Sequence, residues 1–216
     1  MTWETYGSFL LFALVLVVVP GPDFAVVTKN TLTAGRARGA WSSAGVASSN
    51  AVQGVAAAVG LGALVVASQP VFDAIKWAGV CYLAFLGVQA LRSAWRGGAA
   101  LPVQADAQTQ AGGAVHGRDA FHGWRQGFLS NITNPKVLVF YLAVLPQFLP
   151  PDVAMWQAAA LALTHAVLSL TYLMLLVGGL HRARRVLGRR AVRRGLDATT
   201  GVVLLAFSAR LAREHA

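Results

Sequence analysis

The chain has 216 residues, of which 56% are hydrophobic and only 12% are charged, and its mean hydropathy is +0.57. Soluble domains carry about 25% charged residues, so this composition, with apolar runs along the whole chain, excludes an ordinary soluble protein and indicates a membrane protein. The net charge of +10 does not indicate a nucleic-acid partner, because the basic residues gather in alternate segments between the apolar runs, as the positive-inside rule describes.

The first apolar segment, residues 6–27, is interrupted near its end by PGPD, which comprises Pro20, Gly21, Pro22 and Asp23. Only residues 6–19 precede this break, and as a helix they cover about 21 Å of a hydrocarbon layer roughly 30 Å thick. The break therefore lies near membrane depth, where irregular backbone is tolerated only against protein or a watery cavity. The segment has no basic start and no cleavage site, so we expect it to be retained rather than removed as a signal peptide.

The next two spans are predicted at residues 40–67 and 72–95. In the first of them, small residues recur every four positions, a pattern typical of close helix contact, at Asn50, Gly54, Ala58 and Gly62. Packing is the simplest role for this face, although Asn50 and Gln53 could also contact a substrate. The single cysteine, Cys81, excludes an internal disulfide.

Residues 96–123 are rich in Gly, Ala and Gln and lack an apolar period, so they predict a flexible cytoplasmic linker. The linker divides the chain into a first half, residues 1–95, and a second half, residues 124–216. The fourth span, residues 127–149, is interrupted at Asn134 and Pro135. Asn134 is a good N-cap and Pro135 suits the first position of a helix, so this break repeats the device of the first span.

The fifth span is predicted at residues 154–180 and contains His165, which could carry protons or simply join two helices by a hydrogen bond. An arginine-rich stretch follows, at residues 181–194, and predicts a cytoplasmic contact with anionic lipid. The sixth span, residues 195–209, is short. Backbone polar groups cannot stay unpaired in lipid, so the spans predict an all-α polytopic membrane protein with six transmembrane helices.

The two halves align with an offset of 113 residues, which sets Pro22 over Pro135 and the second span over the fifth. Three spans in each half make the halves cross the membrane in opposite senses, as in inverted-repeat transporters. We therefore expect two inverted three-helix repeats with broken first and fourth helices. Because the basic segments mark the cytoplasmic side, both termini are expected outside.

Asp23 and Lys136 occupy equivalent positions under this offset, each directly after its proline. An ionisable residue inside a span costs about 2.5–3.5 kcal/mol on insertion scales and is a functional candidate by default. The pair could bind the two ends of a zwitterion, or the two side chains could pair with each other. Alternatively, both breaks lie at the cytoplasmic surface, where Lys136 reaches toward water and Asp23 only favours the start of a helix.

Four pieces of the sequence, taken in order, resemble the LysE/RhtB family of amino-acid exporters. They are PGPD at residues 20–23, GRARG at 35–39, KWAGVCYLAFLGVQALR at 76–92 and GFLSNITNPKVLVFYLAVLPQF at 127–148. The resemblance extends over nearly the whole chain, and the Asn-Pro-Lys element within that frame is specific. It implies export of amino acids or close derivatives across a bacterial inner membrane, coupled to the proton gradient.

The family's motif positions carry over onto two groups of residues, and with the polar pair of the second span they complete the predicted substrate site. Its members are Pro20, Gly21, Pro22, Asp23, Asn50, Gln53, Asn131, Asn134, Pro135 and Lys136. Asp23 and His165 are the candidates for proton coupling.

The predicted function is secondary export of an amino acid or derivative by proton antiport, and the alternative is a passive channel for small metabolites. An enzyme is not expected, because the sequence has no H-E-x-x-H, no serine elbow and no workable Cys–His pair. We expect no metal and no cofactor; the partners are the substrate, protons and membrane lipid. The sequence leaves open whether the chain forms a homo-oligomer.

Overall fold

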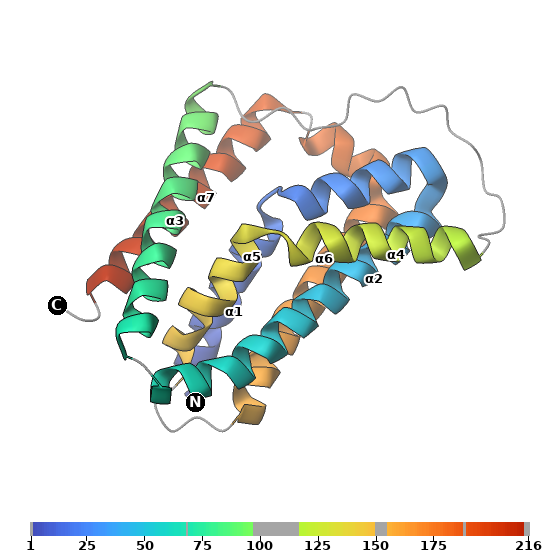
Figure 1. Ribbon diagram of the computed structural model, residues 1–216. Coiled ribbons are helices and arrows are strands. Elements are labelled where there is room, and N and C mark those ends of the chain that lie inside the picture. The colour runs from blue at the N-terminus through green and yellow to red at the C-terminus, as the bar shows by residue number, and fades with distance from the viewer. Residues whose placement is uncertain (1, 68, 97–116, 150–154, 188, 214–216) are drawn as a thin grey trace.

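A computed structural model describes residues 2–67, 69–96, 117–149, 155–187 and 189–213, and every element within these ranges is helical (Figure 1). The elements are α1 (Trp3–Val18), α2 (Pro22–Ala67), α3 (Gln69–Arg96), α4 (Gly117–Ile132), α5 (Pro135–Val139), the π-helix η1 (Phe140–Val144), the 3-10 helix η2 (Leu145–Phe148), α6 (Met155–Leu187) and α7 (Arg190–Arg213).

Both predicted breaks are confirmed. α1 ends before Pro20 and α2 begins at Pro22, with a bend of 51° between the two helices. In the second half α4 ends at Ile132, and the chain bends by 55° before α5 begins at Pro135. Asn134 caps α5 as expected, because its side-chain oxygen accepts a hydrogen bond of 3.0 Å from the Lys136 N–H.

α2 is longer than the sequence predicted, because helix continues through residues 28–39, which were expected to connect two spans. Thr31 and Thr33 donate their hydroxyls to the carbonyl oxygens of Val27 and Lys29, which is how such side chains are accommodated inside a helix. Only Gly35, with φ 88°, leaves the helical region, which glycine does at little cost. It divides α2 into a first arm (residues 22–34) and a second arm (residues 36–67), and the second arm turns back toward the start of the first (Figure 1).

The predicted linker is shorter than expected. Residues 117–123 belong to α4, whose first turn contains Asp119, and an ion pair of 3.7 Å joins Asp119 to Arg38 of α2. The acidic side chain suits a helix start, and this packing extends α4 ten residues ahead of the predicted fourth span. Arg96 ends α3, and residues 97–116, the rest of the predicted linker, lie outside the described residues.

In the described part of the chain, three helices are long and apolar enough to cross a membrane: Asp73–Arg96, Met155–Leu180 and Arg190–Arg213. Counting each bent pair as one span gives five. The third and fifth predicted spans are therefore confirmed as candidate spans. The sixth, expected only at residues 195–209, extends at both ends within α7.

The helices pack in two main sets (Figure 1). The second arm of α2 crosses α4 and lies along α6, and α3 lies along α7. In the pairs α2–α6 and α3–α7 the chains run in opposite directions. A cluster of aromatic side chains fills the space between α1 and the second half, with ring contacts that join Phe9 and Phe12 to Phe140, Phe148 and Phe207. This cluster holds α1 against η1 and η2, so that the two helix breaks lie next to each other.

Candidate functional site

Lys136, from the second break, binds the backbone of the first. Its ammonium donates hydrogen bonds of 3.1 Å to the carbonyl oxygen of Leu16 and 3.3 Å to that of Val19. The last carbonyls of a helix have no partner within the helix, and a cation near them is favourable. Gly21 leaves the space for this approach, because a β-carbon there would lie 3.3 Å from the Lys136 Nζ.

Asp23, from the first break, binds side chains of the second. Its Oδ2 accepts hydrogen bonds of 3.1 Å from the amide groups of both Asn131 and Asn134. The resolved side chains show no ion pair between Asp23 and Lys136, so the expected alternative of direct pairing is not what this conformation contains. Instead each charged residue is bound to the helix break of the other half.

A small cavity of about 20 Å³ lies beside Asp23, between α1, the second arm of α2 and α6. Its lining includes Asn50, Asn131, Lys136 and His165. The buried Oδ1 atoms of Asp23 and Asn50 have no hydrogen-bond donor in the described part of the chain. Buried acceptors without a donor are rare and costly. The cavity can hold about one water molecule, so it suits a proton or a single small donor but no larger ligand.

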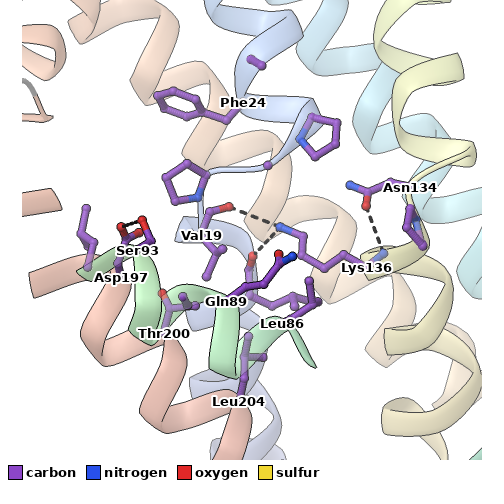
Figure 2. A pocket seen from close by; sticks show the side chains of 18 of the residues that line it. Val19, Phe24, Leu86, Gln89, Ser93, Asn134, Lys136, Asp197, Thr200 and Leu204 are labelled. Carbon is purple, nitrogen blue, oxygen red and sulfur yellow. Dashed lines mark hydrogen bonds between the residues drawn. The ribbon is translucent and has the colours of Figure 1, made fainter. Parts of the chain in front are cut away.

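A larger cavity of about 510 Å³ lies on the other side of Lys136 (Figure 2). The two breaks form one wall, with residues 19–22 from the first and 134–136 from the second, while α3 and α7 form the other. Its volume is within the range of small-molecule sites, about 300–1,000 Å³. Most of the lining is apolar, and polar side chains face it from both walls: Tyr82, Gln89, Ser93, Asn134, Lys136, Asp197 and Thr200.

Residues 14–215 match the family of LysE type translocators. The chain belongs to this family. A homoserine/homoserine lactone efflux protein of Salmonella typhimurium is 37% identical over 153 residues, which are 70% of this chain and 68% of that protein. A leucine efflux protein of Klebsiella pneumoniae is 29% identical over 215 residues, 96% of this chain and 94% of that protein. No solved structure matches the chain.

This LysE type translocator is therefore a multi-pass membrane protein of a transporter family and not an enzyme. The structure gathers its predicted site residues around the two breaks. The larger cavity is lined by six of them: Pro20, Gly21, Pro22, Asn134, Pro135 and Lys136. The smaller is lined by Gly21, Asp23, Asn50, Asn131, Lys136 and the proton candidate His165.

Gln53 lines neither of these cavities. Its amide nitrogen donates to the side-chain and backbone oxygens of Asn131, at 3.0 and 3.3 Å. Gln53 thereby orients the asparagine that binds Asp23. His165 is buried, and its Nδ1 lies 2.8 Å from the Tyr141 hydroxyl, so the translocator has the helix-joining hydrogen bond that was the alternative to a proton role.

The residues with which α3 and α7 line the larger cavity were not among the predicted site residues. Tyr82, Gln89 and Ser93 are spaced seven and four apart on α3, and Asp197 and Thr200 are three apart on α7. Such spacings place side chains on one helix face, so the sequence could have indicated a polar face on each of these helices. Asp197 stood at the edge of the short predicted sixth span, so its position well inside a long helix was not apparent.

Proposed function

We propose that this translocator is a secondary exporter of amino acids or close derivatives, which works in a bacterial inner membrane by proton antiport. The names of its relatives support the substrate class, since homoserine, its lactone and leucine all carry a primary amine next to a carbonyl group. The strongest support for a transport function is the cavity of about 510 Å³, which lies where two helix breaks are hydrogen-bonded to each other. Interrupted spans in corresponding positions are the best pointer to a transporter's binding site.

The proposed architecture has six spans in two inverted repeats, residues 1–95 and 124–216, joined by residues 96–123. If the two arms of α2 are counted separately at Gly35, each half has a broken first span followed by two further spans. The antiparallel packing of the second arm of α2 on α6, and of α3 on α7, is what a two-fold axis between the halves would produce (Figure 1). Both termini then lie outside the cell.

In the proposed cycle, a substrate in the larger cavity presents its carboxylate to Lys136 and to the start of α5 at Asn134 and Pro135. Two of the three ammonium hydrogens of Lys136 are engaged by carbonyls, which leaves one for a ligand. The positive end of the helix dipole at the start of α5 favours an anion in the same place.

Asp23 is the proposed proton site. It does not line the larger cavity, and the space beside it, about 20 Å³, is too small for an amino acid. Its Oδ1 is buried without a donor, so it can take a proton that arrives from outside, with His165 across the small cavity as the second proton candidate. Protonation weakens the hydrogen bonds that Asp23 accepts from Asn131 and Asn134, and thereby the contact that joins the two helix breaks. Proton and substrate couple only if they bind the alternating states with different affinity.

Transport by proteoliposomes tests this function. With an acidic interior, the purified protein should accumulate external leucine or homoserine above the outside concentration, and a protonophore should abolish the accumulation. Uptake that stops at equal concentrations would identify the passive channel instead. If neither compound enters faster than in protein-free liposomes, the proposed substrate class is wrong.

A further inference from the structure

We propose that Asp197 of α7 binds the amine of the substrate across the larger cavity from Lys136. This inference rests on the proposed function, because it concerns how the exported amino acid is held. It moves the amine away from Asp23, the acid that the sequence alone suggested.

The charges that line the cavity support this assignment. Among the described residues that surround it, Lys136 is the one base and Asp197 the one acid (Figure 2). They come from opposite walls, Lys136 from the second break and Asp197 from α7. Charged side chains are expensive inside a membrane and normally face a partner or a ligand path. A basic and an acidic group that line one cavity match the carboxylate and the ammonium of an amino acid, which are both attached to its α-carbon.

Ser93 of α3 positions the carboxylate. Its hydroxyl donates a hydrogen bond of 2.7 Å to the Asp197 Oδ2 (Figure 2), and such charge-assisted bonds are short and strong. The two helices are also in backbone contact, since a β-carbon on Gly201 would lie 2.8 Å from the Gly87 carbonyl oxygen. Asp197 is therefore held on rigid elements, as a group that recognises a ligand must be.

Beside these two charged residues the cavity can hold the side chain of the substrate. Leu86 and Leu204 line it beside Gln89 and Thr200, and Figure 2 shows Gln89 between the Lys136 side and the Asp197 side. An amide can both donate and accept hydrogen bonds, so Gln89 is suited to the polar part of a hydroxylated side chain.

Asp23 is less suited to the amine. Of the two cavities, the residue lines only the smaller one, whose volume of about 20 Å³ is too small for an amino acid. A substrate in the larger cavity meets Lys136 and Asp197 first. The two acids thus have different roles: Asp197 binds the amine of the substrate, and Asp23 binds the proton.

Competition in the proteoliposome assay tests the assignment. The probes are the amino acid that the wild type accumulates, leucine or homoserine, and its N-acetyl derivative, which keeps the carboxylate but has no charged amine. The wild type should prefer the free amino acid as a competitor by about tenfold or more, the effect of one hydrogen bond to a charged group. In Asp197→Asn the preference should fall to about twofold or less through weaker binding of the free amino acid.

Matched variants separate binding from positioning. Asp119→Asn removes an acid from α4, outside both cavities, and should keep the preference. Ser93→Ala should weaken the preference partly, and Ser93→Thr, which retains the hydroxyl, should restore it. If Asp197→Asn transports and still prefers the free amino acid by tenfold, the assignment is wrong while the proposed function stands. If the wild type accumulates no amino acid, the proposed function itself fails.

A second measurement needs no variant and covers the outcome in which Asp197→Asn fails to fold. Carboxylates of the purified wild type are labelled with a water-soluble carbodiimide and a probe amine. Both reagents are in large excess over the added amino acid or derivative, so that the ligand's own carboxylate and amine do not compete chemically, and the labelled peptides are identified by mass spectrometry. The free amino acid should protect Asp197 from labelling, and the N-acetyl derivative should not. Equal labelling of Asp197 with and without the amino acid would overturn the inference.

Discussion

At the scale of single residues, each of the two charged residues of the predicted site, Asp23 and Lys136, is bound to the helix break of the other half. Lys136 of the second break binds the carbonyls of Leu16 and Val19 in the first, and Asp23 of the first break accepts from Asn131 and Asn134 in the second. Each bond joins residues more than 100 positions apart in the chain. Any change in the charge of either residue therefore acts on both breaks at once.

Replacement of Asp23 by asparagine should abolish uphill export while the protein remains inserted at the normal level. The amide keeps the size of the side chain but cannot take up and release a proton. Its NH2 group, which replaces one carboxylate oxygen, donates hydrogen bonds where that oxygen accepted them. Accumulation against the gradient in proteoliposomes measures the effect, and Asp119→Asn is the control. Accumulation equal to that of the wild type would remove Asp23 from the coupling step.

At the scale of the helices, close approaches fix where the two breaks lie. α4 crosses the second arm of α2 with backbone against backbone, because a β-carbon on Gly127 would collide with the carbonyl oxygen of Ser42, and one on Gly45 with that of Trp124. Asn131, four residues after Gly127 on the same helix, is carried to Asp23 by this crossing.

Gly127→Ala should lower the stability of the protein by about 1–3 kcal/mol, as for an overpacked contact that must shift backbone. A thermal unfolding curve in detergent should show a lower midpoint and, because Asn131 moves with α4, weaker transport. Gly7→Ala on α1 is the matched control, since a β-carbon there meets nothing within 4 Å. An equal midpoint for Gly127→Ala and Gly7→Ala would contradict the close crossing.

Some of these elements could be predicted from sequence and others could not, for physical reasons. Pro22, Asn134 and Pro135 act on their own local backbone, so both breaks and the cap of α5 were foreseen. The helix through residues 28–39 was not foreseen, because its polar residues suggested a connection, although residues 23–34 contain no proline or glycine. The wall of the larger cavity that α3 and α7 form depends on how these two helices pack together. A single sequence does not show which faces of two helices far apart in the chain are in contact.

At the scale of the whole molecule, the two halves are interlocked rather than merely adjacent. The second arm of α2 lies on both α4 and α6, and α1 packs on η1 and η2 through aromatic rings. Both cavities are lined by residues from both halves. A movement of one half relative to the other would therefore change both cavities together, as alternating access requires.

The proposed topology of six spans predicts the side of the membrane on which each segment lies. In a chain whose Cys81 is replaced by serine, a cysteine near residue 2 or near the C-terminus should react with a membrane-impermeant maleimide in intact cells. A cysteine within residues 97–116 should react only after the membrane is opened. Labelling of one terminus but not the other would favour an odd number of spans and exclude the arrangement of two three-span halves.

The dimensions of the two cavities have a pharmacological consequence. About 510 Å³ is room for a drug-sized ligand, whereas the cavity on the other side of Lys136 measures only about 20 Å³. An amino acid extended by a bulky apolar group could still reach Lys136 and Asp197 and pack against Leu86 and Leu204. By filling the larger cavity it would compete with the natural cargo and hold the protein in this conformation, and treated cells would retain the compounds that they normally release.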